Sequence, residues 1–286
     1  MKKSFAIIII LSVLFSCFNA CSFFNIAEEA AEKSPVYNTD INGELVPSFE
    51  DVAASTLDPR LYAADECGRM HYNDLSVQTY TGIDVSVFQG DIDWNAVKAD
   101  GIDFVMLRAG YRGYGPKGIL GEDDNFRRNA VAARAAGLEV GAYFFSQATN
   151  DAEAREEANY LLGIIRGCDL TYPVAYDWEI IDYDTARTDN MPPEQITACA
   201  AAFCDTIAAA GYEPLIYFNC EVGYFNYDLS ALKSYHFWLA EYSDIPAFYY
   251  NYKIWQYDIH GSVNGINGDV DMNICLHDFT GNSAVG

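Results

Sequence analysis

From Thr81 onward, short apolar strands alternate with amphipathic helices, and turn residues separate them. This alternation is typical of βαβ units, which build a mostly parallel sheet covered by helices. We expect strands at residues 82–86, 104–110, 139–145, 173–177, 215–219, 237–241, 252–257 and 270–275. Helices are expected at residues 94–100, 124–136, 151–165 and 192–210, and the helical pattern fades beyond Asn219. Eight strands with helices among the early ones predict an α/β fold, an irregular barrel related to the TIM barrel.

Composition limits the kind of partner. The chain has 286 residues, 51% of them apolar, which is enough for a sizeable core and excludes a disordered chain. Its formal charge of −24 repels nucleic acid and anionic membrane surfaces, so we expect neither as a direct partner. The aromatic share of 15% supplies flat surfaces on which sugars stack, although most such residues in a barrel belong to its core.

The first residues have the order of a secretory signal. Lys2 and Lys3 precede an apolar run that ends at Phe15, and this run is too short for a stable membrane anchor. Leu14–Cys17 resembles the lipobox of bacterial lipoproteins, which implies lipid attachment at Cys17, with Cys21 as a poorer second candidate. An ordinary cleaved signal is the alternative. We expect an exported bacterial protein, lipid-anchored at the cell surface or envelope, or otherwise secreted.

The chain is therefore divided into three parts. Residues 1–21 are the signal peptide with its candidate lipobox, residues 22–80 a tether and irregular N-terminal extension, and residues 81–286 the barrel domain. The cysteines beyond the signal match no zinc or haem motif, and the four histidines form no ligand set. We expect no metal, no cofactor and a monomer.

Carboxylates interrupt the expected strands where catalytic residues of such barrels stand, at the carboxyl ends. Asp177 and Glu179 are two residues apart at the end of one strand, so they point to the same face. Two acids in one cavity repel each other, which raises one pKa and leaves the other group ionised. A general acid beside an anion is the minimum set of groups needed to cleave a glycosidic bond.

A series of motifs resembles the glycoside hydrolase family 25 lysozymes, the Chalaropsis-type muramidases. The resemblance covers about residues 81–277, and its motifs follow in the family's order: Gly82–Gly90, Ile92–Trp94, Phe104–Gly110, Gly141–Phe145, Asp177–Glu179, Tyr217, Trp238–Tyr242, Trp255–Tyr257 and Val270–Asn273. Each motif alone is modest, but the ordered set is specific. The family has a barrel of five β/α units and three further strands, the (β/α)5(β)3 type.

The resemblance implies an enzyme that cleaves the β-1,4 bond between N-acetylmuramic acid and N-acetylglucosamine in peptidoglycan. Glu179 is then the proton donor, and Asp177 stabilises or assists the transition state, as a nucleophile or through the substrate's N-acetyl group. Asp84 and Asp271 complete the acidic cluster and tune the pair. The resemblance places further side chains along the sugar groove: Tyr143, Tyr217, Trp238, Gln256 and, as either a substrate contact or a buried partner of the acids, Arg108.

Two other functions use the same residues. A wall-binding protein would keep the groove without turnover, although all four acids are present. A barrel hydrolase acting on another N-acetylated glycan, such as chitin, would share the chemistry and differ in substrate.

Overall fold

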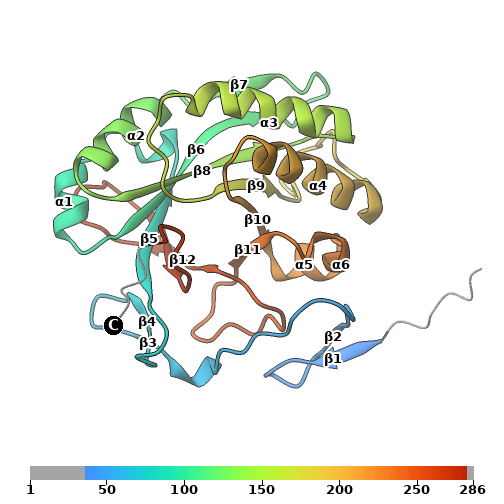
Figure 1. Cartoon of the computed structure of the whole chain (residues 1–286), viewed down its shortest axis with the longest axis horizontal. Coiled ribbons are helices and arrows are strands. Elements are labelled where there is room, and N and C mark those ends of the chain that lie inside the picture. Colours follow the sequence, from blue (N-terminus) through green and yellow to red (C-terminus); the bar gives the residue numbers. More distant parts are fainter. Residues whose placement is uncertain (1–35, 282–286) are drawn as a thin grey trace, which may run out of the picture. The chain divides into compact units, whose positions relative to one another are not determined.

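Eight strands close into a barrel in the computed structural model, which describes residues 36–281 (Figure 1). The first seven run parallel, and the last is antiparallel to both of its neighbours, where it closes the ring. Around the ring the order is β5 (Tyr80–Val85), β6 (Phe104–Arg112), β8 (Glu139–Ser146), β9 (Val174–Trp178), β10 (Pro214–Asn219), β11 (His236–Ala240), β12 (Ile254–Gly261) and β13 (Val270–Cys275). The predicted irregular barrel is confirmed, and so are its eight strands.

Helices cover the outer face of the early strands (Figure 1). They are α1 (Trp94–Ala99), α2 (Phe126–Ala135), α3 (Asp151–Ile165) and α4 (Pro193–Ala209), and the short α5 (Cys220–Phe225) and α6 (Leu229–Leu232) connect β10 to β11. The Asn150 side chain caps α3 by accepting a hydrogen bond from the backbone N–H of Glu153 at 3.1 Å. Within residues 36–281, no helix follows β11, and none is long and apolar enough to span a membrane.

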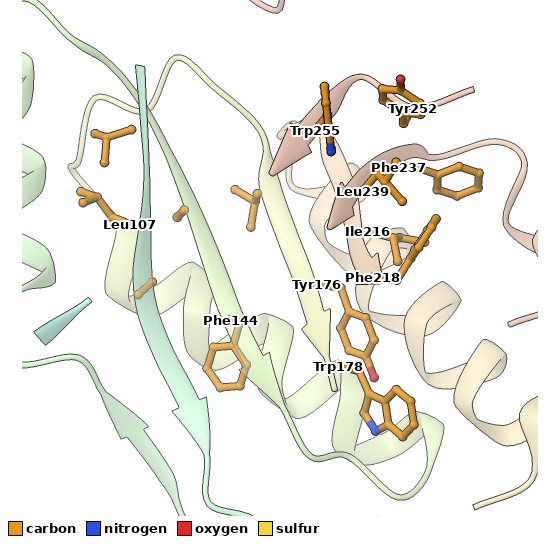
Figure 2. Packing of buried hydrophobic residues seen from close by; sticks show 14 of the residues in the cluster. Leu107, Phe144, Tyr176, Trp178, Ile216, Phe218, Phe237, Leu239, Tyr252 and Trp255 are labelled. Carbon is orange, nitrogen blue, oxygen red and sulfur yellow. The ribbon is translucent and has the colours of Figure 1, made fainter. Parts of the chain in front are cut away.

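The apolar side chains form two layers, one inside the barrel and one between the barrel and its helices. Figure 2 shows part of the outer layer, in which the side chains of Tyr176 and Trp178 lie on the same side of β9. Successive residues of a strand point to opposite faces, so Asp177, between these two aromatics, faces the barrel interior. The buried outer layer thus fixes the direction of an inner acid.

One strand at the barrel mouth was not expected from the sequence. The short β7 (Leu120–Glu122) pairs antiparallel with the end of β6, beyond the point where β5 stops. Three residues are too few for a recognisable alternating pattern. The resulting hairpin extends the barrel mouth beyond β5, and Tyr111, Arg112 and Glu122 of its two strands line a groove there.

The described part of the N-terminal extension packs against β13, α5 and the segment that precedes β12. It forms two hairpins, β1 (Tyr37–Thr39) with β2 (Leu45–Pro47) and β3 (Tyr62–Ala64) with β4 (Met70–Tyr72) (Figure 1). The Tyr62 ring meets Trp255 of β12 edge to face at 4.9 Å, and its hydroxyl lies 3.0 Å from that of Tyr252. Trp255 is fully buried as a result. The expected signal, most of the tether, and Cys17 and Cys21 lie outside the described residues.

Candidate active site

The four predicted acids come together at the mouth of the barrel. Asp84 is the next-to-last residue of β5 and pairs in register with Asp271, because the antiparallel β13 begins where β5 ends. Asp177 stands near the end of β9, and Glu179 directly follows that strand. They line one pocket of about 210 Å³, called here the acid pocket, together with Tyr143, Tyr217, Trp238, Tyr242, Gln256 and Ile259.

Asp84 is held by amide donors. Its Oδ2 accepts hydrogen bonds from Gln256 Nε2 at 2.7 Å and from Asn273 Nδ2 at 2.8 Å. Burial raises the pKa of Asp84 well above its ordinary value, and the charge of Asp271 raises it further. Burial also raises the pKa of Asp271 to about 6, although a hydrogen bond with Asp84 opposes this shift. This pair therefore holds on to a proton at pH values where an exposed aspartate is ionised.

Asp177 and Glu179 lack such support. Asp177 is only 4% exposed, and its Oδ1 has no hydrogen-bond partner within residues 36–281. Burial, followed by the charge of Glu179, raises the pKa of Asp177 well above its ordinary value. Glu179 has a solvent-accessible side chain, but the protein walls around its carboxyl desolvate it and raise its pKa, and the two carboxyls share a hydrogen bond. The pair can therefore supply a protonated acid beside an anion.

Aromatic and amide groups orient the donors to Asp84. Gln256 Oε1 accepts hydrogen bonds from the hydroxyls of Tyr217 at 2.9 Å and Tyr242 at 2.8 Å, which leaves Gln256 Nε2 for Asp84. Asn273 Oδ1 likewise accepts from Trp238 Nε1 at 2.8 Å. Each amide oxygen is thus occupied, so each amide nitrogen faces the acid.

A larger groove of about 720 Å³, called here the long groove, adjoins the acid pocket and shares Tyr143, Asp177 and Glu179 with it. Arg108 lines the long groove. Its Nε and Nη2 each lie 2.9 Å from Asp123 Oδ2. The ion pair of Arg108 is therefore with Asp123, outside the four acids, while its charge still opposes the rise in the pKa of Asp177.

Three polar residues of this region had no assigned role in the sequence analysis. Asn273 lies two residues beyond Asp271 on the same face of β13, and this spacing was a usable signal. Tyr242 directly follows Glu241 in one of the family motifs. No sequence pattern pointed to Asp123, because it reaches Arg108 only through the β6–β7 hairpin.

Glu241, which was expected at a strand end, stabilises a loop and does not line the acid pocket. Its carboxylate accepts hydrogen bonds from the backbone N–H groups of Ala247 at 2.8 Å and Phe248 at 3.2 Å. It thereby holds the loop that follows β11. Among residues 36–281, no group of three His, Cys, Asp or Glu side chains is arranged to hold a metal ion, and all six cysteines there are free.

Comparison with known proteins gives a consistent result. Residues 83–266 match the model of the family "Glycosyl hydrolases family 25". The chain is 30% identical over 193 residues to an autolytic lysozyme of Clostridium acetobutylicum, and this match covers 67% of the chain and 54% of that relative. It is 29% identical over 205 residues to lysozyme M1 of Streptomyces globisporus, covering 67% of the chain and 66% of that relative.

Solved structures share the fold. The bacterial lysozyme from Streptomyces coelicolor aligns with a TM-score of 0.54 and 25% identity, over 70% of this chain and 92% of that one. The modular autolysin LytC from Streptococcus pneumoniae aligns with a TM-score of 0.59 and 24% identity, over 83% of this chain and 56% of that one. The chain thus spans about half the length of the autolytic lysozyme and of LytC, and the predicted family is confirmed.

Proposed function

The chain belongs to the glycosyl hydrolases family 25, and we propose that it hydrolyses peptidoglycan at the β-1,4 bond between N-acetylmuramic acid and N-acetylglucosamine. The observation that carries this proposal is the carboxyl pair of Asp177 and Glu179, desolvated at the junction of the acid pocket and the long groove. The lysozyme names of the two curated relatives support the choice of substrate.

In the proposed reaction, Glu179 donates a proton to the leaving glycosidic oxygen. Burial raises the pKa of Glu179 against the opposing effect of its hydrogen bond with Asp177, and this keeps the carboxyl protonated closer to neutral pH, as a general acid requires. Asp177 stabilises the positive charge that develops at the anomeric carbon, either as a nucleophile or by assisting attack by the substrate's N-acetyl group. Asp84 and Asp271 hold sugar hydroxyls and maintain the field around the reacting pair.

The shape of the site suits a polymer. The long groove is open at its rim, where Phe88 is 82% and Tyr183 72% exposed. Exposed aromatic rings provide stacking surfaces for sugar faces. The acid pocket is smaller and is lined by Tyr143, Tyr217, Trp238 and Gln256, which we propose hold the sugar at the cleaved bond.

The location of the proposed activity follows from the N-terminal sequence. We propose an exported monomer, attached to the envelope through a lipid at Cys17 or Cys21, or secreted after cleavage of an ordinary signal. Radiolabelled palmitate incorporation into the expressed chain, compared with Cys17→Ala and Cys21→Ala variants, identifies the attachment site; no incorporation in the parent chain contradicts lipidation.

The deciding experiment is a digest of purified peptidoglycan by the full chain, with mass spectrometry of the new reducing ends. We expect reducing N-acetylmuramic acid, absent with Glu179→Gln. Turnover of chitin oligomers in preference to peptidoglycan would point to the other barrel glycosidase. No release from several wall types, with glycan binding retained, would instead support the wall-binding protein.

A further inference from the structure

The long groove carries an uneven set of charges. Two arginines and six acids line it, the acids being Glu122, Asp123, Asp124, Asp177, Glu179 and Asp182. Arg112 is only 4% exposed, and each of its three guanidinium nitrogens has a partner: Glu157 for Nε, Gly118 O for Nη1, and Glu156 and Glu153 O for Nη2. Arg108 is thus the one groove cation left to meet a ligand, among the residues described.

Arg108 is held in a fixed position with part of its guanidinium free. Nε and Nη2 bind Asp123, whereas Nη1 has no hydrogen-bond partner within residues 36–281. Asp123 is buried and also accepts hydrogen bonds from the backbone N–H groups of Val87 and Asn125, at 2.9 and 3.0 Å, so it is itself anchored. A guanidinium held in this way needs little reorganisation to bind an anion.

Two aromatic rings flank the guanidinium. Its central carbon lies 5.0 Å from the ring centroid of Phe88 and 5.7 Å from that of Tyr111. A bulge in β6 between Arg108 and Gly110 interrupts the alternation of that strand beside Arg108. The Arg108 side chain is only 15% exposed, and this partial burial strengthens a charge-assisted hydrogen bond made at its free edge.

We propose that Arg108 is a specificity-determining residue that binds a carboxylate carried by the muramic acid units of the glycan. This inference rests on the proposed function. A neutral sugar hydroxyl could donate a hydrogen bond to any of the six groove acids. An anionic group is repelled by those acids, and among the described groove residues only Arg108 offers it a free cationic edge. Chitin has no such group, so the contact would select peptidoglycan.

The carboxylate has two possible sources, the lactyl group of muramic acid itself and the acids of the stem peptide. In intact peptidoglycan the lactyl carboxyl is an amide, and the peptide supplies the free carboxylates. In strands stripped of peptide by an amidase, the lactyl carboxylate is free. Converting that carboxylate into a methyl amide gives a neutral strand of the same sugar sequence.

The test measures binding separately from cleavage. Glu179→Gln and Glu179→Gln/Arg108→Met chains are titrated calorimetrically with soluble peptide-bearing strands, peptide-free strands and methyl-amidated strands. We expect Arg108→Met to weaken binding about tenfold on a carboxylate-bearing strand, with equal affinities of both chains for the neutral strand. A loss confined to peptide-bearing or to peptide-free strands assigns the carboxylate to its source.

Matched variants separate the contact from a fold effect. Arg108→Met/Asp123→Asn removes both members of the ion pair, so no unpaired buried carboxylate remains, and it should reproduce the same selective loss. Arg60→Gln removes one charge at a side chain of the extension that is 84% exposed, and should leave all affinities unchanged.

Equal weakening on all three strands would overturn the proposal, because Arg108 would then act through Asp177 or the fold. Unchanged affinity on every strand would overturn it too. The proposed function is tested separately, since absence of new reducing ends with the wild-type chain refutes the hydrolase whatever Arg108 binds.

Discussion

The acid pocket holds two carboxyl pairs that the barrel supports in different ways. Asp84 and Asp271 belong to adjoining antiparallel strands, and two amide donors bind Asp84 Oδ2 at 2.7 and 2.8 Å. Asp177 and Glu179 come from β9 and the residue after it, and Asp177 Oδ1 has no hydrogen-bond partner among the described residues. Asp84 is thus held by neighbouring amide donors, whereas Asp177 has, among the described residues, only the hydrogen bond that it shares with Glu179.

We propose that this difference separates a supporting role, for Asp84 and Asp271, from a reacting role, for Asp177 and Glu179. Two amide hydrogen bonds hold the Asp84 carboxyl in one orientation, and burial keeps its pKa well above the ordinary value, so it is a poor proton donor. A desolvated pair without donors changes its protonation easily when a substrate atom approaches. In the proposed reaction, Asp84 and Asp271 orient the sugar, and Asp177 and Glu179 carry out the proton transfer.

The largest expected effect comes from neutralising the reacting pair. Glu179→Gln and Asp177→Asn should each lower kcat by about 10³-fold, because each removes a group that acts in the transition state. Asp84→Asn should cost at least tenfold less, since an amide keeps most of the polar contacts. Rates of reducing-end release from peptidoglycan provide the comparison. If Asp84→Asn costs more than Glu179→Gln, the roles of the two pairs are reversed.

A smaller effect is expected from removing the support of Asp84. Asn273→Asp keeps an oxygen for Trp238 Nε1 but replaces the amide donor with a fifth acid beside the four of the pocket. We expect a loss of kcat of about 10- to 100-fold at pH 7 and a smaller loss at pH 5. At the lower pH, the introduced carboxyl is more often protonated and can again donate a hydrogen bond to Asp84.

The matched variant Asn273→Leu removes the donor without adding an acid, so its loss should not depend on pH in this way. A pH–rate profile of both variants distinguishes them. Identical profiles would mean that the added charge has no influence on the pair.

Asp271 offers a test in which activity and stability move in opposite directions. Its pKa in the folded protein is about 6, above the ordinary 3.8, so the folded state keeps a proton that the unfolded chain has lost. Stability from this group is therefore complete below about pH 4 and is lost as the pH rises to about 6. Asp271→Asn avoids that loss, and should gain up to about 2 kcal/mol in free energy of unfolding at pH 7 relative to wild type.

Urea unfolding at pH 4 and pH 7 measures this gain, which should be near zero at pH 4. Activity should fall at both pH values. A variant that is less stable than wild type at pH 7 would show that Asp271 stabilises the fold as an anion.

Much of this arrangement followed from the sequence. Strand alternation placed Asp177 and Glu179 on one face, and the family resemblance added Asp84 and Asp271, which the structure brings into the same pocket. The start of β13 at Val270 was also expected, and it explains why an acid near the beginning of one strand meets an acid at the end of another. The shared face of Asp177 and Glu179 and the bounds of the strands depend on local periodicity, which a sequence records directly.

Contacts that depend on the packing of distant segments could not be predicted. The Arg108–Asp123 ion pair needs the β6–β7 hairpin, whose second strand has three residues. The packing of Tyr62 on Trp255 joins the β3–β4 hairpin to β12. Neither residue pair has a spacing that a helix or strand repeat would select, so only the folded chain brings them together.

The smallest expected effect tests how tightly Gln256 must be oriented. Its Oε1 accepts hydrogen bonds from both Tyr217 and Tyr242, and Tyr242 is 53% exposed. Tyr242→Phe leaves the Tyr217 hydrogen bond in place, so Gln256 Nε2 stays on Asp84, and kcat/KM should fall only about two- to fivefold. Tyr217→Phe should cost more, because its hydroxyl is the more buried donor. If Tyr242→Phe is the more damaging change, this rim tyrosine contacts the substrate itself, and Asp84 does not depend on its hydroxyl for support.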